Sequence, residues 1–257
     1  MNLQKGKKIY FASDLHLGTP TYVASRTREN RFIQWLDTIE KDAQAIYIIG
    51  DIFDFWHEYK TVVPKGFVRL LGKLAAMADA GIAIHIFTGN HDMWMQDYFE
   101  KEIGAKVYFQ PIQIIINQHL FFIGHGDGLG PKDYKYKMLK KVFANKICQW
   151  AFRWIHPDIG MGIANYFSYK SRYGHDEVAV EKFLGEENEW LIQYCKRKLQ
   201  TVSADFFVFG HRHLPLDFQL NEKSRYINTG DWLHFCSYAV YDGAEMQLCY
   251  FKQENEK

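Results

Sequence analysis

Three short apolar runs, each followed at once by polar residues, constrain the fold of this chain more than any other feature. Residues 8–12, 45–49 and 82–87 have the length and the β-branched and aromatic content of buried strands. Amphipathic helical patterns over 26–41 and 65–80 separate these runs. Alternating strands and helices predict a parallel sheet with crossover helices, in which ligands bind beyond the carboxyl ends of the strands.

The rest of the chain predicts a second group of strands and a helical insertion. Residues 107–109, 112–116 and 119–123 have the pattern of antiparallel strands, the last two joined by a turn at Asn117-Gln118. We expect one domain over 1–257, an α/β fold of two sheets interrupted by a helical cap at about 131–203. Strand patterns return after the cap at 205–209, 217–220, 226–228, 238–241 and 247–250.

Composition excludes several classes of protein. With 47% hydrophobic residues in 257, the chain is not a disordered protein, and 31 Lys and Arg against 30 Asp and Glu argue against a general nucleic-acid binder. Four scattered cysteines form no Cys-x-x-Cys pair, so no zinc knuckle or disulfide framework is expected. The polar, basic start of the chain is unlike a secretory signal, which predicts a cytoplasmic protein.

Five polar motifs follow apolar runs in order along the chain. A single Gly-Asp or Gly-His pair is usually an ordinary turn, but five such motifs, each at the end of a run, indicate a metal centre. The motifs are Asp14-Leu15-His16, Gly50-Asp51 with Asp54, Gly89-Asn90-His91-Asp92, Gly124-His125-Gly126-Asp127 and Gly210-His211-Arg212-His213.

The spacing of these side chains predicts two adjacent divalent ions. Residues two apart beyond a strand can point to the same side, and a carboxylate such as that of Asp51 can give one oxygen to each ion. Carboxylate, amide and imidazole donors without thiolate favour Mn²⁺, with Fe, Zn or Mg as alternatives. We assign Asp14, His16, Asp51 and His213 to the first ion, and Asp51, Asn90, His125 and His211 to the second.

A catalytic pair is predicted beside the ions. Two ions roughly 3.5 to 4 Å apart can convert a shared water into a nucleophile near neutral pH. His91 follows Asn90 directly, so its imidazole can stabilise the transition state or protonate the leaving oxygen. Asp54 is expected to orient His91. For Asp92 and Asp127, turn formation and hydrogen bonding to the ligands both remain open.

These motifs resemble the calcineurin-like metallophosphoesterase family. Its pattern is Asp-x-His, Gly-Asp-x-x-Asp, Gly-Asn-His-Asp or Glu, Gly-His and Gly-His-x-His, and every element is present in order from Asp14 to His213. The resemblance implies a four-layer αββα sandwich with a dinuclear metal centre that hydrolyses phosphoesters.

Residues 13–18, 50–56 and 125–127 and the helical segment after them resemble a narrower group of the family. Its members hydrolyse the pyrophosphate bond of UDP-2,3-diacylglucosamine to UMP and 2,3-diacylglucosamine 1-phosphate, a step of lipid A synthesis at the inner membrane surface. The substrate implied is a nucleotide-linked lipid whose acyl chains the cap holds. The residues that would contact it are Asn90, His91, Asp133, Ser168, Lys170, Ser171 and His211.

The chain departs from that group at three places. His91 stands where its members carry Arg, Asp54 where they carry Glu, and Gly130-Pro131 where they carry Cys-Thr. One alternative is therefore a phosphatase or phosphodiesterase of the same family with a soluble substrate. A non-catalytic scaffold of the same fold is a second alternative, although no ligand is missing.

The start of the cap has two interpretations. Lysines between 132 and 146 lie beside an apolar stripe at helical spacing. Periodicity alone favours a core stripe with a solvated back face, whereas the resemblance favours contact with lipid and peripheral contact with a membrane. We expect a monomer or a small homo-oligomer. The stripe comprises Leu139, Val142, Phe143, Ile147, Trp150 and Trp154.

Overall fold

The computed structural model describes residues 1–130, 138, 142, 143, 145–173 and 182–252, and the side chains of all of these except 165 and 169–173. They form a six-stranded sheet in the order β11-β10-β1-β2-β3-β4 and a five-stranded sheet in the order β5-β6-β7-β9-β8. The strands are β1 (Lys8–Ala12), β2 (Ala43–Ile49), β3 (Ala83–Phe87), β4 (Lys106–Tyr108), β5 (Ile112–Ile116), β6 (His119–Ile123), β7 (Phe206–Phe209), β8 (Pro215–Gln219), β9 (Arg225–Thr229), β10 (Ser237–Tyr241) and β11 (Met246–Tyr250). The helices are α1 (Tyr22–Ile39), α2 (Val68–Asp79), the π-helical η1 (Phe99–Ile103), α4 (Lys146–Phe152), α5 (Pro157–Tyr173) and α6 (Trp190–Lys198).

Strands β1 to β4 run parallel, and helices connect them as the sequence predicts. α1 begins after Thr21, whose hydroxyl accepts a hydrogen bond from the Ala24 amide at 3.2 Å and so caps the helix. The expectation that 107–109 forms an antiparallel strand is wrong. η1 provides a crossover after β3, and this returns the chain parallel to β3 as β4.

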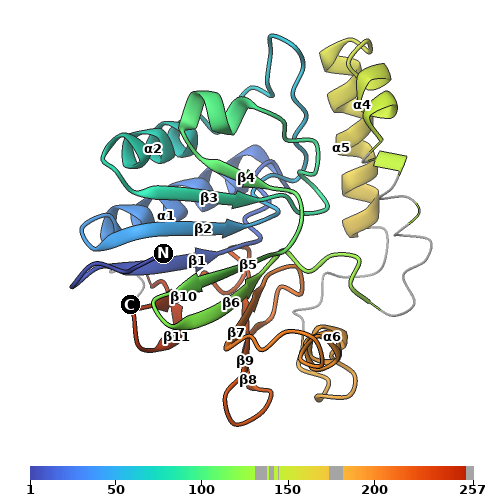
Figure 1. Ribbon diagram of the computed structural model, residues 1–257. Helices are drawn as coiled ribbons and strands as arrows, with labels where there is room; N and C mark the ends of the chain where they lie inside the picture. The colour runs from blue at the N-terminus through green and yellow to red at the C-terminus, as the bar shows by residue number, and fades with distance from the viewer. Residues whose placement is uncertain (131–137, 139–141, 144, 174–181, 253–257) are drawn as a thin grey trace.

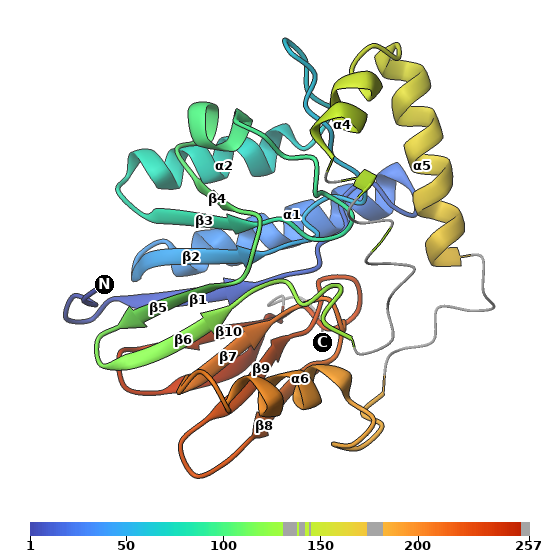
Figure 2. The same ribbon diagram turned by 45° about the vertical axis from the view of Figure 1, so that its right-hand side comes forward.

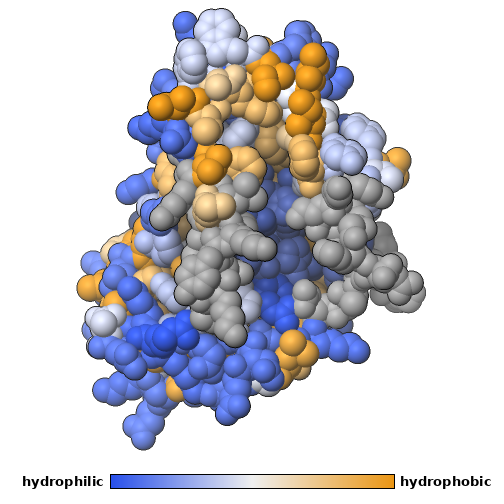
Figure 3. Space-filling model, turned by 90° about the vertical axis from the view of Figure 1, so that its right-hand side faces the viewer, coloured by the Kyte–Doolittle hydropathy of each residue, from blue (hydrophilic) through white to orange (hydrophobic). Residues whose placement is uncertain are grey.

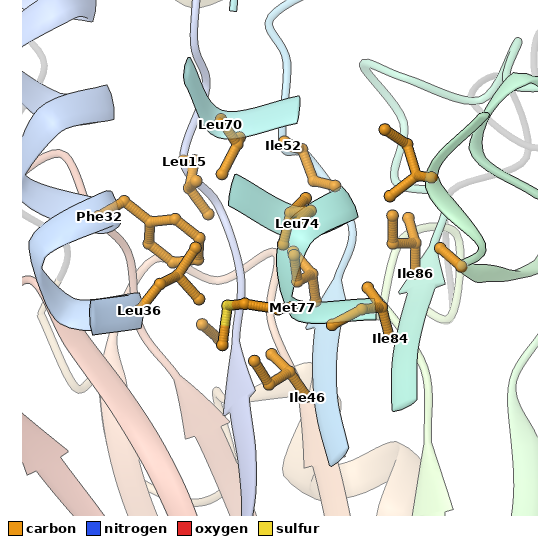
Figure 4. Close-up of a cluster of buried hydrophobic side chains, with 14 of the residues drawn as sticks. Leu15, Phe32, Leu36, Ile46, Ile52, Leu70, Leu74, Met77, Ile84 and Ile86 are labelled. Carbon is orange, nitrogen blue, oxygen red and sulfur yellow. The ribbon is translucent and has the colours of Figure 1, made fainter. Parts of the chain in front are cut away.

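Side chains alternate between the two faces of each sheet, and the elements pack against these faces in four layers. In β1, Ile9 and Phe11 face the second sheet, whereas Tyr10 and Ala12 face α1 and α2. Figure 4 shows the outer cluster, in which Phe32 and Leu36 of α1 and Leu74 of α2 cover the six-stranded sheet. α6 covers the outer face of the five-stranded sheet (Figure 1). The predicted αββα sandwich is therefore confirmed.

α4 and α5 stand apart from these layers, at the end of the six-stranded sheet toward which the arrows of β1, β2 and β3 point (Figures 1 and 2). α6 falls inside the range expected for the cap but does not join them. Its buried residues Leu191, Ile192 and Cys195 form one apolar face, which packs on the five-stranded sheet.

The interpretation of the cap stripe as a core stripe is wrong for the residues that the structure describes. Ile147, Trp150 and Trp154 are 73%, 59% and 77% exposed, and Val142 and Phe143 are also exposed. Leu139 lies outside the described residues. None of the residues of α4 is buried, although Phe152 at its end packs against the rings of His57 and Trp94. Among the described helices, none combines the length and the apolar character needed to cross a membrane.

Two histidines away from the predicted metal centre should make the fold sensitive to acid. His57 is buried among the rings of Tyr59, Trp94 and Phe152. Burial, with the nearby Arg153, lowers the pKa of His57 to about 4. Burial likewise lowers the pKa of His85 to about 4. Both side chains are therefore neutral in the folded protein at neutral pH.

Because an unfolded histidine has a pKa of about 6.5, the unfolded state binds more protons, and stability is lost as the pH falls from about 6.5 to 4. For His57 alone, the free energy of unfolding should drop by on the order of 2 kcal/mol between pH 7.5 and 5. Urea unfolding of the wild type and of His57→Phe at both pH values measures this. The variant should lose less stability than the wild type, and equal losses would contradict the prediction.

Candidate metal centre

The five motifs converge at one place, because each follows the carboxyl end of a strand. Asp14 and His16 come after β1, Asp51 and Asp54 after β2, and Asn90 and His91 after β3. The second sheet adds His125 after β6, and His211 and His213 after β7. Three overlapping groups of side chains could each hold a metal ion, namely Asp14, His16 and His213; His16, Asp51 and His91; and Asp51, His125 and His211.

Short distances join several of the side chains that we assign to each ion position. The Nε2 atoms of His16 and His213 lie 3.1 Å apart, and Asp14 Oδ1 is 3.3 Å from the same His213 atom. In the second group, Asp51 Oδ2 lies 3.3 Å from His125 Nε2. The same oxygen is 3.7 Å from His16 Nε2, so the Asp51 carboxylate lies between the two groups.

Three polar atoms of the site fit the role of metal ligands because they are buried without a hydrogen-bond partner in the described part of the chain. Asp14 Oδ1, Asn90 Oδ1 and His125 Nε2 are buried and have no hydrogen-bond partner among the residues that the structure describes. Buried polar atoms are normally hydrogen-bonded, since leaving one unsatisfied costs about 1 to 3 kcal/mol. Oxygen and imidazole nitrogen atoms in this arrangement suit divalent cations. An ion at the first position would satisfy Asp14 Oδ1, and an ion at the second would satisfy Asn90 Oδ1 and His125 Nε2.

The backbone at the site is held in an unusual conformation. Of the eight described residues other than glycine with positive φ, five are predicted ligands, and they carry φ values of 45° to 66°. Such angles are uncommon for side chains with a Cβ and persist only where surrounding contacts enforce them. These five residues are Asp14, His16, Asp51, His211 and His213.

Close packing leaves no room for side chains at two glycines of the site. A Cβ on Gly89 would overlap Asp51 Oδ1, and a Cβ on Gly210 would overlap Ser13 Oγ and Asp14 Oδ2. Glycine in the Gly-Asn-His and Gly-His-x-His motifs is therefore required by the approach of neighbouring ligands.

Buried carboxylates and imidazoles perturb one another strongly. Burial by itself would raise the pKa of Asp51, but the His125, His91 and His16 imidazoles hold it well below its ordinary value. Burial opposes the charged form of His125, yet Asp51 and Asp14 raise its pKa to about 10. Burial, together with charge on His125, lowers the pKa of His211 to about 3. Perturbations of this kind are typical of functional sites.

His91 lies beside the ligands and contacts both Asp54 and the cap. Its Nδ1 is 3.0 Å from the main-chain oxygen of Asp54 and 3.2 Å from Ser168 Oγ on α5. The Asp54 carboxylate is farther, at 3.8 Å, and accepts a hydrogen bond of 2.7 Å from the Ser168 hydroxyl. A carbonyl oxygen only accepts, so this contact favours the tautomer with the proton on Nδ1, in which Nε2 can act on a substrate.

Several residues that support the ligands were missed or left open by the sequence analysis. Asp231 Oδ2 lies 3.2 Å from His213 Nδ1, so it can fix that ring in place. Arg28 of α1 donates hydrogen bonds to the main-chain oxygens of Leu15 and His16. Asp92 accepts from the Gly89 and Ile52 amides, both at 2.7 Å, and so joins two ligand loops. Gly230-Asp231 repeats the Gly50-Asp51 pattern after a strand, a signal that could have identified Asp231.

The remaining predicted contacts with substrate fall partly outside the described residues. Asp133 lies outside the described residues. Lys170 and Ser171 belong to α5, but their side chains are not described. Ser168 is a cap residue that contacts His91 and Asp54 at the centre.

Comparison with known proteins identifies a family for this chain. The family model for calcineurin-like phosphoesterases matches residues 7–215. A UDP-2,3-diacylglucosamine hydrolase of Porphyromonas gingivalis is 39% identical over 94% of this chain and 96% of its own. The enzyme of that name from Haemophilus influenzae is 27% identical over 88% of this chain and 91% of its own.

Among solved structures, YfcE, a phosphoesterase from E. coli, has a TM-score of 0.46 and 16% identity over 93% of this chain and 90% of its own, a likeness that carries no functional conclusion. The match of the family model over most of the chain, and the relative that is 39% identical, show the family directly. The chain belongs to the calcineurin-like phosphoesterases and is a hydrolase. The resemblance inferred from the motifs is thereby confirmed.

Proposed function

We propose that this chain hydrolyses the pyrophosphate bond of UDP-2,3-diacylglucosamine, or of a closely related nucleotide-linked lipid, to UMP and 2,3-diacylglucosamine 1-phosphate. The observation that carries the proposal is the 39% identity with the P. gingivalis relative of that name, which extends over 94% of this chain and so includes the cap. Similarity limited to the metal motifs would support only a general phosphoesterase.

The proposed cofactors are two divalent cations, with Mn²⁺ the first choice and Fe, Zn or Mg as alternatives. Asp14, His16, Asp51 and His213 would hold one, and Asp51, Asn90, His125 and His211 the other. Bound cations of this kind lower the pKa of water and neutralise phosphate oxygens as charge builds.

In this proposal His91 is the general acid, and Asp54 and Ser168 orient its ring. With a proton on each ring nitrogen, His91 would donate the Nε2 proton, or a hydrogen bond from it, to the oxygen that leaves phosphorus. The main-chain oxygen of Asp54 and the Ser168 hydroxyl hold the other ring nitrogen, so the imidazole cannot rotate without losing both contacts. Asn90, His91 and His211 would also contact the phosphates of the substrate. We place Asp133, Ser168, Lys170 and Ser171 at its glucosamine region.

A cavity of about 610 Å³ beside the metal centre supports a lipid substrate. Its lining includes Asp54 and Leu17, which belong to the loops after β2 and β1, and residues 156–158 and Met161 at the start of α5. Its apolar wall includes Phe55, Val62, Val63, Phe67 and Met161. We propose that at least one acyl chain of the substrate lies here, with the pyrophosphate directed to the metals.

Substrate tests separate this proposal from its alternatives. With Mn²⁺, the purified protein should convert UDP-2,3-diacylglucosamine to equal amounts of UMP and lipid phosphate, as measured by mass spectrometry, and EDTA should abolish the conversion. Turnover of soluble phosphomonoesters or phosphodiesters without release of UMP would favour another phosphoesterase of the family. No turnover of either class, by protein with metal bound, would favour the scaffold.

We further propose that the cap contacts the cytoplasmic face of the inner membrane. Ile147, Trp150 and Trp154 are exposed on the cap, and Figure 3 shows apolar side chains gathered over the upper part of this face. Tryptophan is favoured at the boundary between lipid and water. Sedimentation with anionic vesicles should fall several-fold in a Trp150→Ser, Trp154→Ser variant. Tyr250→Ser, which changes an exposed aromatic residue on β11, is the control. Equal sedimentation of all three proteins would contradict membrane contact.

A further inference from the structure

Arg212 lies between two predicted ligands, His211 and His213, but its own side chain contacts the segment that leads into α6. The guanidinium Nε is 3.1 Å from Glu189 Oε2, and Nη2 is 3.2 Å from Glu189 Oε1. The Arg212 side chain is 13% exposed and that of Glu189 only 2% exposed. A two-point pair of this geometry fixes the orientation of both groups as well as their separation.

Glu189 is placed to act on the loop that carries the two histidines. It directly precedes α6, and its neighbour Trp190 packs its ring against His211, with centroids 5.8 Å apart. Two adjacent residues at the start of α6 therefore contact two adjacent residues of the ligand loop. Because His211 and His213 both have positive φ, the loop needs such contacts to keep its shape.

The same arginine also reaches the segment by which the chain returns from α5. Arg212 Nη2 donates to the main-chain oxygen of Lys182 at 3.2 Å, and Glu189 Oε1 accepts from the Leu184 amide at 3.3 Å. In Figure 2, α6 lies below α5, beside the five-stranded sheet. The ligand loop, α6 and residues 182–189 are thus joined through one buried ion pair.

We propose that Glu189 and Arg212 form a positioning pair that holds His211 and His213 in the orientation that binds metal, and so sets the affinity of the centre for divalent cations. The proposal rests on the proposed role of these histidines as ligands. Interactions that orient metal ligands typically change metal affinity or activity by about 10- to 100-fold. Since each partner acts through the other, loss of either should have the same effect as loss of both.

Titration of the metal-free protein with Mn²⁺ tests this role independently of activity. Glu189→Gln and Arg212→Lys should each bind the metal about 10- to 100-fold more weakly than the wild type, and the double variant no more weakly than the single ones. Arg212→Lys keeps the charge but loses the two-point geometry. Asp217→Asn is the matched control, because Asp217 and Arg225 form a similar two-point pair in the same sheet, with Nε to Oδ1 at 3.2 Å. Its affinity should be unchanged.

Two results would overturn the positioning role. These are unchanged affinity in both variants, even where their unfolding temperature is lower, and losses that multiply in the double variant. Should Glu189→Gln fail to fold, the affinity of Arg212→Lys alone decides. A wild-type protein without saturable Mn²⁺ binding would contradict the proposed metal centre itself, whereas normal wild-type binding with unaffected variants contradicts only the pair.

Discussion

Asp51→Asn is expected to lower turnover by about 10³-fold or more and to leave at most one Mn²⁺ ion bound per chain. The Asp51 carboxylate lies within 3.7 Å of His16 and 3.3 Å of His125, so it is the group that both ion positions share. An amide of the same shape cannot give a charged oxygen to each ion. A loss of several kcal/mol of transition-state stabilisation corresponds to this change in rate.

Metal content by elemental analysis and turnover by release of UMP measure the effect. Asp97→Asn is the control, since Asp97 is an exposed carboxylate paired with Lys101 on the protein surface, and it should behave as the wild type. Circular dichroism should show both variants folded. If folded Asp51→Asn retained two ions and turned over within tenfold of the wild type, the shared position of Asp51 would be wrong.

His91→Gln is expected to lower kcat by about 10² to 10⁴ while two metal ions remain bound, because the variant loses proton transfer but keeps every predicted ligand. His91 Nδ1 lies 3.0 Å from the Asp54 main-chain oxygen, which orients the opposite nitrogen for catalysis. KM should change much less than kcat, since the interaction forms mainly in the transition state.

Metal content distinguishes a role of His91 as an acid catalyst from a role as a metal ligand. His91 belongs to one group that could hold an ion, together with His16 and Asp51. Loss of an ion from His91→Gln would therefore identify His91 as a ligand instead of an acid. His234→Gln, which changes an exposed histidine on the turn after Asp231, should alter neither metal content nor kcat.

The strands and the convergence of the five motifs could be predicted because both depend on local patterns. Asp14, Asp51 and Asn90 follow parallel strands within three residues, so the order of the sheet alone brings them to one edge. His125 and His211 follow β6 and β7, which are also parallel neighbours. For these five predicted ligands, a short distance along the chain from a strand end indicated a place at this edge of the sheets.

What the sequence could not predict depends on contacts between distant segments. Whether β4 pairs parallel depends on the η1 crossover, and the position of α6 depends on which sheet face its apolar side meets. The pairing of Glu189 with Arg212 links the residue before α6 to the loop after β7, and neither residue type marks a site by itself. The exposure of Trp150 and Trp154 contradicts the interpretation of the cap stripe as buried core. Helical periodicity shows that a helix has an apolar side, but it does not show whether that side is buried in the protein or contacts another surface.

Anomalous scattering from crystals soaked with Mn²⁺ tests the central claim most directly. Two peaks should appear roughly 3.5 to 4 Å apart on either side of the Asp51 carboxylate. One should be bounded by Asp14, His16 and His213, and the other by Asn90, His125 and His211. A single peak, or none, at full soaking concentration would contradict a centre of two metal ions.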